Sequence, residues 1–227
     1  LYEGHAVAAV AANSQSVAEA ACDLIEVDYE VLPHVIDVEA AVAEDAPLLF
    51  EDMITRDVDP VPTKPSNIAK VVGFEIGDIA EGFAQADEIV EKEYRTAAVH
   101  QGYIEPHATL ARSDADGQVE LWSASQGHFQ IRNWVSNICG IPLGDIKVNP
   151  AEIGGGFGGK TVVYVEPVAV VLSRKSGHPV RVNMTRDEVF KASGPTSGAY
   201  MKIKIGAKKD GTITAAEGDY YYQAGAF

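Results

Sequence analysis

A run of glycines around one phenylalanine is the part of this sequence most suited to chemistry. Five of the seven residues in 154–160, Gly-Gly-Gly-Phe-Gly-Gly-Lys, are glycine. Glycine forgoes side-chain packing and loses much backbone entropy on folding, so such a run is favoured where another group must approach the main chain closely. A helical pattern follows, so we expect the backbone N–H groups of the run to lie near a helix start, where they could receive an anion or a polarised oxygen.

With Thr161 added, the run also fits the spacing of a phosphate-binding P-loop, in which Lys160 and Thr161 would reach phosphate and magnesium. A P-loop follows a strand directly, whereas residues 149–152, Asn-Pro-Ala-Glu, separate this run from the apolar residues 146–148. No later apolar run ends in the aspartate that a nucleotide-bound magnesium requires. A P-loop nucleotide-binding protein is therefore the less favoured alternative.

The glycine run belongs to an ordered set of motifs. His-Gln-Gly-Tyr-Ile-Glu-Pro-His-Ala occupies 100–108, Trp-Ser-Ala-Ser-Gln occupies 122–126, and Arg-Val-Asn-Met-Thr-Arg-Asp-Glu occupies 181–188. In this order and spacing the chain resembles the molybdenum-binding subunit of the xanthine dehydrogenase / aldehyde oxidase / carbon monoxide dehydrogenase family, the molybdenum hydroxylases. The resemblance spans nearly the whole chain, and separate motifs agree on it.

The resemblance implies roles for individual residues. The amide of Gln126 can donate a hydrogen bond without adding charge, and the matching glutamine of the family hydrogen-bonds an apical oxygen of molybdenum, so Gln126 is the catalytic candidate. The cofactor-binding candidates are Gly155, Gly156, Phe157, Gly158 and Gly159, and the substrate-pocket candidates are Phe157 and Thr161. The plainer alternatives are a polar residue at a helix start for Gln126 and a glycine turn with a core-anchoring phenylalanine. Lys160 could screen negative charge or face solvent.

Thr161 departs from the purine-oxidising members of the family, in which a glutamate directly follows the lysine of the loop and holds the heterocycle. A hydroxyl cannot supply the same charge-assisted hydrogen bond. A purine substrate is therefore less favoured, and aldehydes, other N-heterocycles and aromatic acyl thioesters stay open.

His100, Glu105 and His107 could suggest a metal site. Pro106 interrupts the group and no fourth ligand is evident. The resemblance treats this stretch as a structural signature beneath the cofactor, so no residue of the chain is predicted as a metal ligand.

The activity that the resemblance implies is the oxidation of an aldehyde, an N-heterocycle or a related electron-poor carbon, with oxygen derived from water. The implied cofactor is a molybdenum–pterin, either molybdopterin or its cytosine dinucleotide, with iron–sulfur clusters and FAD on other chains or segments. The implied partners are a small-molecule substrate and iron–sulfur and flavin subunits or domains in an oligomeric complex. A non-catalytic scaffold or assembly subunit of the same fold is the alternative from another functional class.

The composition of the chain excludes some classes of binding partner. Thirty-three acidic and eighteen basic residues give a net charge of −15, which repels nucleic acid and anionic membranes. Two cysteines, Cys22 and Cys139, are too few for an iron–sulfur cluster. No stretch approaches the roughly 18 apolar residues of a membrane span. We expect a cytoplasmic protein without a nucleic-acid or membrane partner.

The elements that must position the motifs are mixed along the chain. We predict strands at 6–12, 26–31, 68–76, 88–99, 109–113, 118–122, 200–207 and 212–223, and helices at 16–25, 78–84, 131–138 and 165–172. Pro167 predicts that the last helix begins later than Thr161 or bends there. Because strands and helices do not alternate strictly, the fold class is α+β with a mixed, largely antiparallel sheet.

Apolar periodicity lapses between about residues 44 and 67, where several prolines stiffen the chain. We predict a partial α/β hammerhead domain over 1–45, as the resemblance implies, a linker over 46–67, and an incomplete N-terminal part of a molybdopterin-binding domain over 68–227. Both chain ends lie inside strand-like patterns, so we expect an internal fragment that is inactive alone. In the family the general-base glutamate and most pterin contacts lie in later segments.

Overall fold

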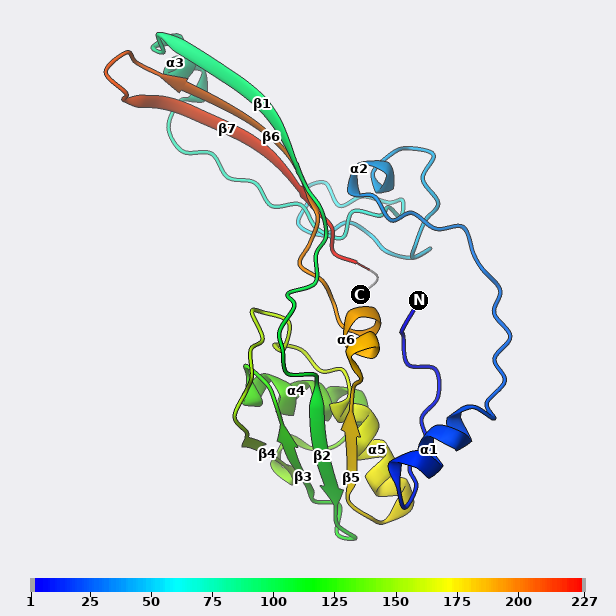
Figure 1. The fold of residues 1–227 in the computed structure, drawn as a ribbon. Coiled ribbons are helices and arrows are strands. Elements are labelled where there is room, and N and C mark those ends of the chain that lie inside the picture. The colour runs from blue at the N-terminus through cyan, green and yellow to red at the C-terminus, as the bar shows by residue number, and fades with distance from the viewer. Residues whose placement is uncertain (1–2, 226–227) are drawn as a thin grey trace. The chain divides into compact units, whose positions relative to one another are not determined.

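The computed structural model describes residues 3–225 and divides by packing into two units. One unit runs to Tyr29 and resumes over His100–Thr196, and the other contains Glu30–Val99 and the residues from Ser197 onward. Each unit has a sheet of its own (Figure 1). The predicted domain boundaries near residues 45 and 67 stay a prediction, and the outermost residues of the predicted domains, 1–2 and 226–227, lie outside the described residues.

The first unit is built around a four-stranded sheet with the strand order β4-β3-β2-β5. Its strands are β2 (Ala108–Ser113), β3 (Val119–Ser123), β4 (Ile146–Pro150) and β5 (Val180–Asn183). Strand β2 is antiparallel to β3 and β5, whereas β3 is parallel to β4. The predicted hairpin of 109–113 and 118–122 is confirmed, and Gly117 supplies a positive φ of 95° in its turn.

Two helices cover one face of this sheet, and the hydrophobic core lies between the two layers (Figure 1). They are α4 (His128–Cys139) and α5 (Glu166–Ser176). The core side chains are Ala111, Val119, Leu121 and Ile146 from the strands, Ile131, Val135, Ala169 and Val170 from the helices, and Ile141. Gly140 and Gly177 end the helices in the left-handed conformation, a common helix stop. Helix α5 begins later than Thr161, as Pro167 in its first turn predicted.

Helix α6 (Arg186–Ala192) was not predicted, although its start carries a clear signal. The Thr185 hydroxyl accepts a hydrogen bond from the Glu188 N–H at 3.2 Å, and the Glu188 carboxylate accepts one from the Thr185 N–H at 2.6 Å. This reciprocal pair is a capping box. The unit also contains α1 (Gln15–Cys22) and the 3-10 helix η1 (Leu143–Asp145). The predicted helix at 16–25 is confirmed in type, and its N-cap is Ser14.

The second unit contains a three-stranded antiparallel sheet with the order β1-β6-β7. Its elements are α2 (Val38–Ala41), α3 (Ile79–Ala84), β1 (Glu88–Thr96), β6 (Ala199–Ala207) and β7 (Ile213–Tyr222). The predicted strands at 88–99, 200–207 and 212–223 and the predicted helix at 78–84 are confirmed within a few residues. The Asp78 carboxylate caps α3 by accepting from the Glu81 N–H at 2.8 Å.

Three predicted strands, at 6–12, 26–31 and 68–76, do not form; only Lys70 makes an isolated bridge, to Arg56. Their apolar side chains are largely exposed: examples are Val7, Val31, Val72 and Phe74. A strand requires a partner strand to satisfy its backbone groups, and within residues 3–225 no segment pairs with 6–12 or 26–31. Of the predicted strand–helix–strand pattern at the N-terminus, only the helix is present.

The predicted fold class, α+β with a mixed and largely antiparallel sheet, is confirmed. Among the described residues, no helix combines the length and apolar character needed to cross a membrane.

Candidate functional site

The fold brings Gln126 and the glycine loop, residues 154–160, into direct contact. The side-chain oxygen of Gln126 accepts hydrogen bonds from the N–H groups of Gly158 and Lys160, both at 3.1 Å. The Gln126 N–H in turn donates to the Lys160 carbonyl at 2.9 Å. Because both side-chain partners are donors, the carbonyl oxygen must face the loop. The amide NH2 of this exposed side chain donates to no acceptor within residues 3–225, so it is a free donor beside the loop.

The end of strand β3 and the start of α4 hold Gln126 in place. Ser125 is buried, and its hydroxyl donates to the Lys160 carbonyl at 3.2 Å while accepting from the Gly127 N–H at 3.1 Å. The N-cap of α4 is Gly127, which has no side-chain cap. Gln126 therefore contacts the loop and does not cap the helix. The alternative role, an ordinary polar residue at a helix start, does not fit these contacts.

Packing beneath the loop explains two of its glycines. A Cβ added at Gly156 would lie 2.5 Å from the Gln126 side-chain oxygen, and one added at Gly159 would lie 2.7 Å from a ring carbon of Tyr103. Contacts this short do not occur between real atoms, so a side chain at either position would displace its neighbour. These two glycines allow Gln126 and Tyr103 to approach the main chain.

Backbone conformation explains two others. Gly155 and Gly158 have φ angles of 95° and 89°, which residues with a side chain rarely adopt. Phe157 between them also has a positive φ, 49°, a conformation that costs an ordinary residue about 1 kcal/mol. Its side chain is 75% exposed, and a Cβ added at Gly158 would meet nothing within 4 Å. The loop is therefore packed on its inner side and open above Gly158.

The loop carries unused hydrogen-bond donors. The N–H groups of Gly155, Gly156 and Phe157 donate to no acceptor in the described part of the chain, whereas the Gly159 N–H closes a turn onto the Gly156 carbonyl at 2.7 Å. Together with the free NH2 of Gln126, these donors fit a ligand that is rich in acceptor oxygens and rests on the main chain. The donors belong to the loop itself. They are not the N–H groups of a helix start, because α5 begins only at Glu166, after an irregular connection over residues 161–165.

Thr161 lies at the end of the loop, and its hydroxyl donates to the Gly158 carbonyl at 2.9 Å. The hydroxyl is thus engaged in holding the loop, which leaves it no second proton to donate to a ligand.

Lys160 neither faces solvent nor screens an exposed charge. Its side chain is 1% exposed, and the ammonium forms an ion pair with the Glu105 carboxylate at 2.7 Å. The same ammonium lies 4.9 Å from the centroid of the Tyr103 ring. A P-loop lysine must reach a bound phosphate, so this buried pairing argues against the nucleotide-binding alternative.

A buried hydrogen-bond chain lies beneath the same region. The Tyr103 hydroxyl lies 2.6 Å from Nε2 of His107 and 3.1 Å from the Ser193 hydroxyl. Nδ1 of His100 accepts from the Gly102 N–H at 3.0 Å, so its Nε2 carries the proton that is donated to Ser193 at 2.9 Å. Within residues 3–225, no three His, Cys, Asp or Glu side chains are grouped so as to hold a metal ion.

The lowered pKa of His107 leads us to expect that the stability of the fold depends on pH. Burial lowers the pKa of His107 to about 4, Lys160 and His100 act in the same direction, and Glu105 opposes them. An unfolded chain titrates its histidines near pH 6.5, so below that pH the unfolded state binds a proton that the folded state does not. The contribution of His107 to the free energy of unfolding should be fully retained above pH 6.5, fall by up to about 3 kcal/mol towards pH 4, and level off below.

This expectation is checked by urea unfolding between pH 4 and 8. His107→Gln should flatten the slope in that window, whereas His178→Gln, at an exposed histidine of the same unit, should leave it unchanged. Identical slopes for the protein and His107→Gln would contradict the assignment.

Sequence reasoning missed several residues that support the site. Arg186 donates to the Tyr103 carbonyl at 2.9 Å and to the Ile104 carbonyl, and the Tyr164 hydroxyl accepts from the Gly194 N–H at 2.8 Å. Arg186 lies within the fourth motif, and the Thr-x-x-Glu spacing at 185–188 could have revealed the helix that presents it.

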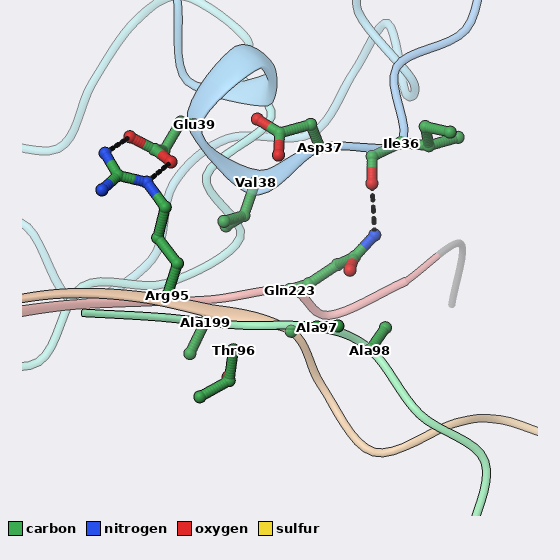
Figure 2. Close-up of a pocket in the computed structure, with 11 residues that line it drawn as sticks. Ile36, Asp37, Val38, Glu39, Arg95, Thr96, Ala97, Ala98, Ala199 and Gln223 are labelled. Atoms are coloured by element: carbon green, nitrogen blue, oxygen red, sulfur yellow. Dashed lines mark hydrogen bonds and ion pairs between the residues drawn. The ribbon is translucent and has the colours of Figure 1, made fainter.

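Each unit has a hollow lined by its own residues. The hollow of the first unit, about 810 Å³, begins at Gln126 and extends along the start of α4, past Phe129 and Arg132, to Lys147 and Val148 on β4. The hollow of the second unit, about 190 Å³, lies between α2 and the ends of β1 and β6 (Figure 2). There Arg95 is held by Glu39 at 2.6 and 2.7 Å, and Gln223 donates to the Ile36 carbonyl at 2.9 Å. The hollow of the first unit reaches the loop through Gln126, which lines it and contacts the loop.

Comparison with known proteins gives consistent matches. Residues 61–227 match the family model of the molybdopterin cofactor-binding domain. The chain is 33% identical to a probable hypoxanthine oxidase of Escherichia coli K12, over 99% of the chain and 26% of that protein. Among solved structures it is similar to reconstituted CO dehydrogenase from Oligotropha carboxidovorans (TM-score 0.75, 32% identity, 91% of this chain and 26% of that one). It is also similar to the aldehyde oxidoreductase of Desulfovibrio gigas (TM-score 0.75, 28% identity, 92% of this chain and 22% of that one).

Each of these three proteins is longer than the chain, which spans about a quarter of their length.

Proposed function

Because this chain belongs to the molybdopterin cofactor-binding domain family of the molybdenum hydroxylases, as its motifs predicted, we propose that it forms part of the molybdenum site of an oxidoreductase. One observation carries the proposal: Gln126 is fastened to the glycine loop through its oxygen, while its NH2 and the N–H groups of Gly155, Gly156 and Phe157 donate to no acceptor within residues 3–225.

These residues would hold the cofactor without contributing a ligand to the metal. The loop N–H groups would donate to acceptor atoms of the bound group, and the Gln126 NH2 would add a donor of fixed direction. When bound, the cofactor would supply a two-electron oxidation in which a carbon–hydrogen bond of the substrate is replaced by a carbon–oxygen bond, with oxygen from water. The chain supplies position and electrostatics, and the cofactor supplies the redox chemistry.

The substrate we propose is an aldehyde, an N-heterocycle or a related electron-poor carbon. Phe157 is exposed at the open side of the loop, where an aromatic ring can line a substrate pocket. Thr161 provides no carboxylate, and its hydroxyl is committed to the Gly158 carbonyl. The chain therefore lacks at this position the anchor that purine-oxidising members use, even though one relative is named a probable hypoxanthine oxidase.

The remaining parts of the enzyme are proposals of the same kind. They comprise molybdopterin or its cytosine dinucleotide as the cofactor, iron–sulfur clusters and FAD on other chains or segments, a cytoplasmic oligomeric complex, and a partial α/β hammerhead domain over residues 1–45. We place the general base and the other pterin contacts outside this chain, so that the chain alone would be inactive.

The test is metal and pterin analysis of the complete protein after expression in a host that makes the cofactor. We expect molybdenum near one per protomer, a pterin released on denaturation, and incorporation of 18O from labelled water when aldehydes and N-heterocycles are screened as substrates. Molybdenum-free protein from such a host would overturn the proposal and favour a non-catalytic scaffold.

A further inference from the structure

We propose that Glu105 and Lys160 form a partly buried clasp that presets the glycine loop for its ligand, which makes Glu105 a positioning residue of the site. The ligand in this statement is the cofactor of the proposed function, on which that part of the inference rests. The clasp itself rests only on contacts among Glu105, Gly154, Gln126 and Lys160.

A single carboxylate oxygen of Glu105 joins the two ends of the loop. It accepts from the Gly154 N–H at 2.7 Å, at the start of the loop, and from the Lys160 ammonium at 2.7 Å, at its end. The Glu105 N–H also donates to the Gly154 carbonyl at 3.2 Å. The Glu105 carboxylate thereby links residue 154 to residue 160 through the Lys160 side chain.

Lys160 connects this clasp to Gln126. Its main-chain N–H and carbonyl are both hydrogen-bonded by Gln126, while its side chain is bonded by Glu105. A shift of Lys160 would therefore disturb both its N–H, which holds the Gln126 side-chain oxygen, and its carbonyl, which holds the Gln126 main-chain N–H. Since Gly155, Phe157 and Gly158 all hold positive φ angles, the loop has little tendency to keep this shape unaided.

The clasp also determines the charge of the site. Lys160 is the only cation in residues 154–160, and its ammonium is buried between Glu105 and the ring of Tyr103. Burial raises the pKa of Glu105, but the hydrogen bonds from Lys160 and Gly154 outweigh it and keep that pKa below its usual value. The loop thus has N–H donors but no exposed ammonium, which suits a group bound through polarised oxygens rather than through an exposed ion pair.

Three variants of the complete protein test the clasp. Glu105→Gln keeps an oxygen for the Gly154 N–H but leaves the Lys160 ammonium buried without a counter-charge. Lys160→Met keeps much of the side-chain volume and removes the ammonium, and the double variant restores neutrality. Glu91→Gln is the control, because Glu91 pairs with Lys202 in an exposed ion pair of 2.9 Å in the other unit.

The first readout is hydrogen–deuterium exchange of peptides covering 154–161 in cofactor-free protein. We expect both single variants to accelerate exchange at least tenfold over Glu91→Gln, and the double variant to return to within about threefold. The second readout is the rate at which bound cofactor is lost, which should rise in the same order, together with a fall in kcat per bound molybdenum at unchanged KM.

The outcomes separate the two proposals. Accelerated exchange in a protein that never binds molybdenum would support the clasp and refute the proposed function. Exchange in both single variants equal to that of Glu91→Gln would refute the clasp. If Glu105→Gln does not fold, Lys160→Met decides, since the carboxylate that it leaves behind is 32% exposed. Lower thermal stability with unchanged loop exchange and unchanged kcat per bound molybdenum would also refute positioning.

Discussion

Replacing Gln126 with glutamate is expected to lower kcat of the complete enzyme by about 100- to 1,000-fold while the cofactor still binds. Glutamate retains an oxygen that can accept from the N–H groups of Gly158 and Lys160, so the loop keeps its shape. It lacks the NH2 donor and adds a negative charge where an acceptor atom is proposed to lie. The measurement is kcat per bound molybdenum, with metal content determined on the same sample.

Two further variants serve as a comparison and a control for this experiment. Gln126→Ala removes both the acceptor and the donor, so it should reduce cofactor content as well as kcat. Gln130→Glu makes the same chemical change at an exposed position of α4 that lines the same hollow, and it should change kcat by less than about threefold. Near-normal turnover by Gln126→Glu would show that Gln126 only supports the loop.

Local sequence signals were sufficient for the elements around the core. The left-handed glycines Gly140 and Gly177 end α4 and α5, and the turn at 114–117 closes the β2–β3 hairpin. Each signal acts within a few residues of the structure that it specifies, because a turn or a helix stop depends on backbone conformation at one or two positions.

The predicted strands that do not form show what local sequence signals cannot determine. Residues 26–31 alternate apolar and acidic side chains, as a half-buried strand does, yet Tyr29 and Val31 are 68% and 83% exposed. Alternation of apolar and polar side chains indicates that a segment is compatible with a sheet. It does not indicate whether another strand is available to pair with that segment. Pairing is a property of segments far apart in sequence, and the pattern of one segment contains no information about the other.

Contacts between residues far apart in sequence were also unpredictable within the site. The family resemblance pointed to Gln126 and the loop, and the structure brings them together. The burial of Lys160 could not be predicted from its neighbours, because a lysine that follows a glycine-rich run resembles a solvent-exposed one. Its partner, Glu105, lies 55 residues earlier, and the interaction exists only once the loop folds over the 100–108 motif.

Gly156→Ala is expected to lower kcat of the complete enzyme by about 100-fold with little loss of stability. Gly156 does not hold a positive φ, so alanine is compatible with its backbone. The added Cβ would lie 2.5 Å from the oxygen and 2.7 Å from the carbonyl carbon of the Gln126 side chain. A flexible side-chain end can move away, so the fold should tolerate the change at a cost of about 1 kcal/mol.

Function should not tolerate it, because the displaced carboxamide loses the N–H groups of Gly158 and Lys160 that orient it. Gly144→Ala is the matched control: Gly144 also lacks a positive φ, and its added Cβ would meet nothing within 4 Å, so kcat should be unchanged. Thermal unfolding and kcat per bound molybdenum, measured on both variants, separate the two effects. Equal kcat in Gly156→Ala and Gly144→Ala would mean that the orientation of Gln126 does not limit the reaction, which would also remove the functional reason for the free donor beside the loop.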